Sequence, residues 1–375
     1  MIMVSIKHAT AFFATTILFF SVRTSTHAQK LSQFSDGLFN EKPSEKKNSP
    51  EIIRENGNLL SNGTVQALIE YKGELYATGS FQIAGKVKAN NIARWNGSEW
   101  APVGAGLDFP GSVLCIYNDE LYVAGSFKTA GGIPAKHIAK WDGTTWSAIG
   151  DPGTYDIQAL VVYKGALYAG GAYSEDESIQ ANVFKWDGQQ WTPLKTKYNN
   201  DVFALAVYKD KLYAGGTFLP NSNAHVMQWN GKKWTDAGVQ LNGAVSCFTV
   251  HNKKLYTGGY FGQLNNKPAP FVVSFDGKKW NYTSKGLGGT LPYHWMSTLM
   301  GYGNDLYAGG NFTTGENTKL AKNLSVFKSD SWSPVVYNME GSVYTMAVYK
   351  NNLYIAGSFS FADGANVSYN IAKIE

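Results

Sequence analysis

The chain has 375 residues, of which 44% are hydrophobic and 16% charged, and its formal net charge is +5. This length is ample for a large hydrophobic core, and so mild a positive charge gives no reason to expect nucleic acid as a partner. The two cysteines, Cys115 and Cys247, lie in apolar runs far apart in the sequence. We therefore expect two buried free thiols and no disulfide.

Residues 1–28 have the pattern of an export signal peptide. Lys7 precedes an apolar stretch at 9–22, and Ala28 ends a Thr-His-Ala sequence suited to cleavage. The apolar stretch is shorter than the roughly 20 residues that span a bilayer; an uncleaved anchor is the alternative interpretation. No second long apolar run follows. We expect a secreted, periplasmic or cell-surface protein with no membrane insertion after cleavage.

Residues 29–50 are polar and charged, with few apolar side chains, which predicts a flexible polar leader. The remainder, 51–375, is repetitive. A Leu-Tyr pair followed by glycine and an aromatic residue recurs at intervals of 43 to 51 residues, beginning at Leu75, Leu121, Leu167, Leu212, Leu255, Leu306 and Leu353. A period in this range without helical periodicity is typical of β-propeller blades.

The second copy predicts four strands, at 113–117, 121–127, 137–141 and 146–149. Asn-Gly or Asp-Gly separates the last two strands in five copies and indicates a type I′ hairpin, because both central residues of that turn need φ > 0. The sixth copy has Ser329-Asp330 instead, and we expect a looser turn there. Trp or Phe flanks this hairpin in six copies, which indicates packing between blades in preference to sugar stacking.

The seventh copy ends after its third strand, at 370–374, while residues 51–54 precede the first copy at the place of a fourth strand. Pairing these two segments would remove the exposed edges of the array. We therefore expect an all-β protein: a seven-bladed β-propeller of four-stranded antiparallel blades, closed by an N-terminal strand that completes the last blade.

Two features of the repeat resemble known families. Leu-Tyr-Ala-Gly-Gly at 167–171, 212–216 and 306–310, followed by an aromatic residue and Trp, resembles the kelch repeat of the galactose-oxidase-like propeller superfamily. Asn-Ile-Ala-Arg-Trp-Asn-Gly at 91–97 is similar to repeats of fungal cortical polarity marker proteins. The resemblance covers residues 51–375 and implies the fold, whereas its members include enzymes, lectins and scaffolds.

The chemistry of these families is not matched by the residues present. Galactose oxidase implies copper held by histidines and tyrosines, yet the histidines after the signal lie in four different copies, at His137, His225, His251 and His294. Sialidase-type propellers need three arginines to hold a carboxylate, and only Arg54 and Arg94 follow the signal. No catalytic sequence motif is present. We expect no metal and no cofactor.

The most distinctive candidate site is a loop at 284–296, which ends in three adjacent ring side chains, Tyr293, His294 and Trp295. The loops that join second to third strands, and those that join blades, vary in length and should emerge on one face. The 284–296 loop is expected on that face, just before an innermost strand. A stacking platform for a sugar or an aromatic ligand is one interpretation. The other is that Trp295 plugs the channel or packs on the sixth blade.

Two carboxylates occupy comparable positions before the first strands of the third and fourth copies. They are Asp156, preceded by Tyr155, and Asp201, which follows Tyr198. Near a channel mouth such groups could bind a cation or act as acid and base. The alternative is that they are turn residues that accept backbone hydrogen bonds.

We favour an exported propeller that binds a glycan or a protein through its variable face and performs no chemistry. Scarce histidine and arginine favour binding over catalysis. A carbohydrate-active enzyme, a hydrolase or lyase with its site at the channel mouth, is the first alternative. A structural module of a surface assembly is the second.

Overall fold

The protein is described by a computed structural model, which places residues 63–154, 156–172, 182–194, 201–218, 225–283, 287–288, 294–314, 321–335, 339–363 and 366–374. All of them belong to the second of the two units into which the chain divides, Asn48–Glu375. These residues form strands and turns. None of the described residues belongs to a helix long and apolar enough to cross a membrane.

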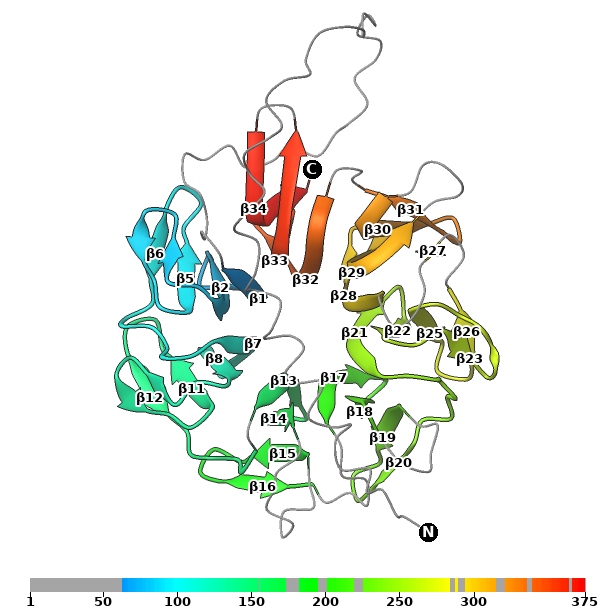
Figure 1. Cartoon of the computed structure of the whole chain (residues 1–375). Helices are drawn as coiled ribbons and strands as arrows, with labels where there is room; N and C mark the ends of the chain where they lie inside the picture. The colour runs from blue at the N-terminus through cyan, green and yellow to red at the C-terminus, as the bar shows by residue number, and fades with distance from the viewer. Residues whose placement is uncertain are drawn as a thin grey trace, which may run out of the picture. The chain divides into compact units, whose positions relative to one another are not determined.

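The strands form seven antiparallel blades, as the repeat predicts (Figure 1). Blade 1 consists of β1 (Thr64–Tyr71), β2 (Glu74–Ser80), β5 (Ile92–Trp95) and β6 (Trp100–Pro102). Blade 2 consists of β7 (Gly111–Tyr117), β8 (Glu120–Gly125), β11 (Ile138–Trp141) and β12 (Trp146–Ala148). Blade 3 consists of β13 (Ile157–Tyr163), β14 (Ala166–Gly171), β15 (Val183–Trp186) and β16 (Trp191–Pro193). Blade 4 consists of β17 (Val202–Tyr208), β18 (Lys211–Gly216), β19 (Val226–Trp229) and β20 (Trp234–Asp236).

The remaining blades follow the same order, with longer strands in the last two. Blade 5 consists of β21 (Val245–His251), β22 (Lys254–Gly259), β25 (Val272–Phe275) and β26 (Trp280–Tyr282). Blade 6 consists of β28 (Trp295–Tyr302), β29 (Asp305–Thr314), β30 (Ala321–Lys328) and β31 (Ser331–Pro334), with β27 (Leu287–Gly288) added to β29. Blade 7 contains β32 (Met339–Tyr349), β33 (Asn352–Asp363) and β34 (Asn366–Ile374). Short hairpins decorate three blades: β3 (Ile83–Ala84) with β4 (Val87–Lys88), β9 (Thr129–Ala130) with β10 (Ile133–Pro134), and β23 (Gln263–Leu264) with β24 (Lys267–Pro268).

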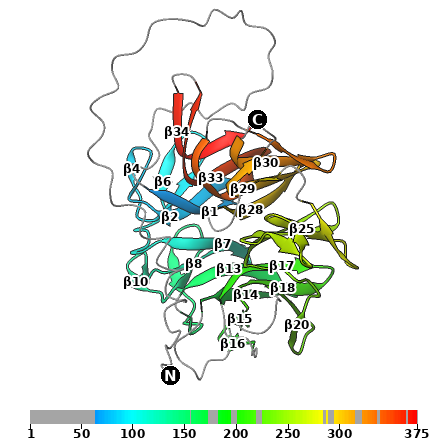
Figure 2. The same cartoon turned by 45° about the vertical axis from the view of Figure 1, so that its right-hand side comes forward.

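The first strand of each blade contacts the first strands of both neighbouring blades, and the cycle returns from β32 to β1. Figures 1 and 2 show these seven strands arranged around a common centre. The blades pack face to face through apolar side chains, such as Val65, Val202 and Met296 on the innermost strands, which are fully buried. The seven-bladed propeller predicted from the sequence is therefore confirmed.

A side chain at the end of each innermost strand binds the backbone of the next blade. In six blades it is a tyrosine, which we call the latch tyrosine, and its hydroxyl donates to a carbonyl in the turn between the next blade's first two strands. The bonds are Tyr71 to Asp119 (2.9 Å), Tyr117 to Gly165 (3.1 Å), Tyr163 to Asp210 (3.1 Å), Tyr208 to Lys253 (2.8 Å), Tyr302 to Asn351 (2.7 Å) and Tyr349 to Gly73 (3.2 Å). His251 replaces tyrosine in blade 5, and its Nε2 lies 3.2 Å from the carbonyl oxygen of Asn304. These contacts hold each blade to its neighbour around the ring.

The paired aromatics of the outer hairpins contact each other within their own blade, mostly with tilted rings, which corrects part of the packing prediction. Trp141 and Trp146 are cross-strand partners with ring centroids 5.2 Å apart. The inter-blade contact also exists, because Trp146 Nε1 donates to the carbonyl of Val103 in the preceding blade at 3.1 Å. Blades 3 and 5 repeat this bond from Trp191 and Trp280.

The type I′ prediction for the outer hairpins is wrong. Only the glycine of each Asn-Gly or Asp-Gly pair has positive φ, for example 111° at Gly143. Asp142 instead accepts the backbone N–H groups of Thr144 and Thr145 on Oδ1, which is an Asx turn within a four-residue loop. Ser329 and Asp330, expected to turn loosely, both have positive φ and form a tight two-residue turn.

The predicted closing strand at 51–54 lies outside the described residues. Within them, blade 7 has three strands, ending with β34, where the other blades have at least four. Closure by the N-terminal segment stays a prediction.

Deleting residues 50–56 tests closure directly. We expect the melting temperature to fall by roughly 5–10 °C, because several backbone hydrogen bonds of about 1 kcal/mol each would be lost. Thermal unfolding followed by circular dichroism measures this, with deletion of residues 34–40 in the leader as a control of equal length. An unchanged melting temperature would contradict the closure model.

Candidate functional site

Seven residues that occupy one repeat position, just before or at the start of each innermost strand, form what we call the axial ring. Its members are Thr64, Pro110, Asp156, Asp201, Ala244, Trp295 and Ser342. The carbonyl of each lies against a glycine in the second strand of the same blade, where a Cβ would be 1.9–2.6 Å from the carbonyl oxygen. The glycine that the repeat carries at this position therefore allows two backbones to approach closely.

At the axial ring, backbone atoms and not side chains make the hydrogen bonds that hold each blade together. The carbonyl oxygens of Pro110, Asp156, Asp201 and Ala244 accept hydrogen bonds of 2.8–3.2 Å from backbone N–H groups of their own blades. The side chains have no common chemistry, and all seven residues except Ser342 are half-buried. The fold thus leaves the side chains at this position free to vary, in contrast to the latch tyrosines at the opposite end of the same strands.

A β-bulge follows each member of the axial ring, and in blades 3 and 6 the side chain of the bulge residue binds the side chain of that member. The pairing register shifts at this point in all seven blades, between Val65 and Ala67 in blade 1 for example, and bulges re-aim side chains in this way. In blade 6 the bulge residue is Ser297, whose hydroxyl oxygen lies 3.1 Å from Trp295 Nε1. This hydrogen bond fixes the indole of Trp295, which is half-buried.

Asp156 has an unsatisfied carboxylate oxygen. Its Oδ2 accepts a hydrogen bond from Gln158 Nε2 at 3.3 Å, whereas Oδ1 is buried and has no partner within the described part of the chain. Burial raises the pKa of Asp156, the nearby charge of Asp201 adds to that effect, and the bond from Gln158 and the proximity of His137 oppose it. A buried carboxylate oxygen without a partner costs free energy unless a ligand or water donates to it.

Three of the residues singled out in the sequence, Asp156, Asp201 and Trp295, occupy equivalent positions in the axial ring. Asp156 and Asp201 precede the innermost strands of blades 3 and 4, β13 and β17, which are in contact. His294 lies one residue before Trp295 and is half-buried. The other three candidates, Tyr155, Tyr198 and Tyr293, lie outside the described residues.

Phe109 was not among the residues predicted from the sequence. Its side chain is 55% exposed, and it precedes Pro110 of the axial ring just as His294 precedes Trp295. Aligning the copies would have found it, because Tyr155 and His294 occupy the same repeat position. Phe109 therefore extends the candidate site onto blade 2.

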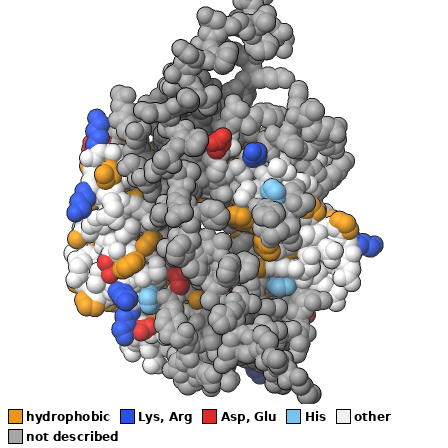
Figure 3. Space-filling model, viewed as in Figure 1, with side chains coloured by type: hydrophobic (Ala, Val, Ile, Leu, Met, Phe, Trp, Pro, Cys, Tyr) orange, Lys and Arg blue, Asp and Glu red, His pale blue; other side chains and the backbone are white. Residues whose placement is uncertain are grey.

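Charged side chains of both signs lie close together on the face drawn in Figure 3, where side chains are coloured. Such an arrangement creates no strong field of one sign on that part of the surface. Among the described residues, no group of three or more His, Cys, Asp or Glu could hold a metal ion.

Both cysteines are free, as expected; Cys247 is buried, whereas Cys115, which was also expected to be buried, is half-buried. Burial raises the pKa of the Cys115 thiol to about 11. Burial also raises the pKa of the Cys247 thiol, to about 12, against a weak opposing hydrogen bond to Gly258. Neither thiol is therefore a nucleophile at neutral pH.

No protein-family model matches the sequence, and no curated protein matches it. The kelch-like resemblance therefore has no support beyond the shared fold. Solved structures do match the fold.

Two crystal structures of an extracellular domain from B. thetaiotaomicron are similar to this chain. They come from a proposed signalling system, described once as a one-component and once as a hybrid two-component system. The first has a TM-score of 0.55 at 10% identity, with 85% of this chain and 39% of that chain covered. The second has a TM-score of 0.57 at 11% identity, with coverages of 87% and 40%. This chain thus spans about two fifths of the length of either domain, and the likeness shows the fold.

Proposed function

We propose that this protein is an extracellular binding propeller that takes a glycan at the axial ring. The buried Oδ1 of Asp156, which has no hydrogen-bond partner among the described residues, carries the proposal. Nothing in the fold requires a carboxylate there, because proline, alanine, threonine and serine fill the same position in other blades. A ligand hydroxyl that donates to this oxygen would supply the missing hydrogen bond.

The other members of the site suit a sugar. Trp295, held through its indole N–H by Ser297, offers an apolar ring surface of the kind that packs against the C–H face of a pyranose. Asp201 and Gln158 add groups that bind hydroxyls. The similar extracellular domains support a location outside the cytoplasm, as does the apolar N-terminal stretch.

Replacing Trp295 with alanine is the decisive test. We expect a glycan array to identify a ligand, and the Trp295→Ala variant to weaken its binding by about 2 kcal/mol or more, which is at least about 30-fold in Kd. Isothermal titration measures the affinity. Melting curves should be unchanged, because the carbonyl of Trp295, and not its side chain, holds the strand.

Two further variants complete this experiment. Asp156→Asn keeps the shape of the side chain and should also weaken binding, whereas Tyr282→Ala removes an exposed aromatic from the outermost strand β26 and should have no effect. If no glycan binds, or if Trp295→Ala binds as well as the native chain, the proposal fails and a protein partner becomes the better hypothesis.

A carbohydrate-active enzyme is the second candidate, and the raised pKa of Asp156 beside Asp201 favours it. Two carboxylates in different environments are the pattern of a general acid paired with a base or nucleophile. Incubating the identified glycan with the protein distinguishes the two functions: released reducing ends that disappear in Asp156→Asn would indicate hydrolysis, and an intact glycan would indicate binding.

A further inference from the structure

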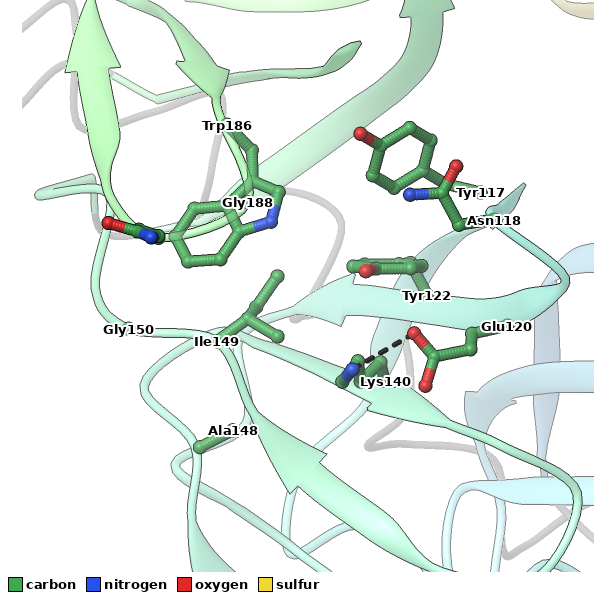
Figure 4. Close-up of a pocket in the computed structure, with 11 residues that line it drawn as sticks. Tyr117, Asn118, Glu120, Tyr122, Lys140, Ala148, Ile149, Gly150, Trp186 and Gly188 are labelled. Carbon is green, nitrogen blue, oxygen red and sulfur yellow. Dashed lines mark hydrogen bonds and ion pairs between the residues drawn. The ribbon is translucent and has the colours of Figure 1, made fainter. Parts of the chain in front are cut away.

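A pocket lies between blades 2 and 3, at the end of the ring opposite the axial ring. Its volume is about 450 Å³, within the range of small-ligand sites. Figure 4 shows Trp186 from blade 3 facing Tyr122 from blade 2 across it, with Ile149 below and the Glu120–Lys140 ion pair at one side. Nothing in the axial site involves these residues.

At this boundary the repeat lacks a lysine that fills the equivalent space at three other boundaries. In blades 1, 4 and 7 the residue after the latch tyrosine is a lysine whose Nζ reaches the next blade's outer turn and binds a carbonyl there. The contacts are Lys72 to Asp142 (2.5 Å), Lys209 to Asp276 (2.7 Å) and Lys350 to Asn96 (2.9 Å). Blade 2 has Asn118 at this position, which is too short to reach.

The surroundings of the glycines in the outer turns also differ between boundaries with and without a bridging lysine. Atoms of the bridging lysine are the nearest neighbours of a Cβ placed at Gly97, Gly143 or Gly277. At Gly188, which lines the pocket, no atom lies within 4 Å of such a Cβ. The same is true at Gly231 of blade 4, where Lys164 of the preceding blade pairs with Asp210 and does not bridge to the outer turn. The space that a lysine side chain fills at three blade boundaries is therefore open beside Gly188.

The side chains that line the pocket indicate which kind of ligand it can bind. The floor is apolar: Tyr122, Ile149 and Trp186 are all buried. At the side, Lys140 Nζ and a Glu120 carboxylate oxygen are 2.9 Å apart, and both side chains remain about 30% exposed and able to bind a further group. At the mouth, the amides of Asn118 and Gln189 offer both donors and acceptors.

These groups fit a neutral ring that carries hydroxyls. A charged ligand would meet a like charge of the ion pair beside the opposite one, so the pair offers it little net attraction. A purely apolar ligand would bury the ion pair and the amides without partners, at a cost in free energy. A hydroxyl can donate to Glu120 and accept from Lys140 while the ring packs over the apolar floor. We propose that this pocket binds a single neutral sugar ring, such as the terminal pyranose of a glycan, independently of the axial ring.

The test uses the lysine that the repeat supplies elsewhere. Asn118 has φ = 49°, and the lysines at this position have φ between 46° and 50°, so Asn118→Lys suits the backbone and should close the pocket without unfolding the blade. Asn252 occupies the same position in blade 5 with φ = 46°. Asn252→Lys is therefore a matched control that adds the same charge at a distant boundary.

Isothermal titration with the methyl pyranosides of glucose, galactose, mannose and N-acetylglucosamine measures binding. We expect at least one to bind with a Kd of about 1 mM or below. Asn118→Lys should weaken its binding at least about 10-fold, whereas Asn252→Lys and Trp295→Ala should leave its binding unchanged. Glu120→Gln, which keeps the shape of the pocket, should also weaken binding and serves if Asn118→Lys lowers the melting temperature.

Three results would overturn the proposal: no pyranoside binds, binding survives both Asn118→Lys and Glu120→Gln, or binding is lost in Trp295→Ala alone. The last result would assign the sugar to the axial ring, so it would remove this pocket while supporting the proposed function.

Discussion

Replacing Trp141 with alanine is expected to lower the free energy of unfolding by about 3–5 kcal/mol. Trp141 is 5% exposed, and its ring packs with Trp146 in the same blade and with Tyr71 and Tyr76 of blade 1. The substitution would therefore leave a cavity at a blade boundary, which neighbouring strands held by their own hydrogen bonds cannot fill. Urea unfolding followed by tryptophan fluorescence measures the loss.

Trp141→Phe is the matched control. Phe275 and Phe327 occupy this position in blades 5 and 6, so the fold accepts phenylalanine there. The indole N–H of Trp141 is buried without a well-formed hydrogen bond in the described residues, so phenylalanine removes at most a weak contact with Tyr76. We expect a loss of at most about 1.5 kcal/mol. Equal losses for the two variants would show that the cavity is not the cause.

Gly216→Ala is expected to destabilise the protein by about 3 kcal/mol or more. A Cβ at this position would lie 1.9 Å from the carbonyl oxygen of Asp201, and both atoms belong to paired backbones that cannot separate without breaking the β17–β18 ladder. Because Asp201 is in the axial ring, ligand binding should weaken as well. Urea unfolding and titration with the identified glycan measure the two effects.

Gly165→Ala controls for backbone conformation. Gly165 has φ = +72°, and no atom lies within 4 Å of the place that a Cβ would take there. Alanine at this position therefore meets only the left-handed strain of about 1–2 kcal/mol. A smaller loss for Gly216→Ala than for Gly165→Ala would contradict the steric explanation of the repeat glycine.

The repeat predicted the fold because each blade carries nearly the same pattern of strands and turns in its sequence. The intervals between Leu-Tyr pairs defined seven blades, and the strands predicted for the second copy, such as 137–141, match the observed Ile138–Trp141 closely. The turns were harder. Asn-Gly favours a type I′ turn in general, but Trp95 and Trp100 are direct cross-strand partners, which leaves four residues between them and room for an Asx turn. The four-residue spacing between the two tryptophans is present in the sequence and could have predicted the longer turn.

The sequence could predict site residues only at positions that can be aligned between copies of the repeat. Asp156, Asp201 and Trp295 could be compared because each stands at the same point of its copy. The unpartnered oxygen of Asp156 was not predictable, because it depends on which side chains surround it in space. The pocket at Gly188 depends likewise on how far Lys72 and its equivalents reach across a blade boundary, although Asn118 in place of lysine is visible when the copies are aligned.

Each residue of the axial ring has a backbone with a structural role and a side chain that, under the proposed function, contacts the ligand. The carbonyl of each member contacts the second strand of its own blade. The side chain on the same Cα is not needed for this contact, and even proline occupies the position, at Pro110. Specificity can therefore diverge during evolution by point substitutions that do not pass through unstable ancestors. For the same reason, the seven positions of the axial ring are suited to protein engineering, in which their side chains are randomised and new binding surfaces are selected while the backbone stays the same.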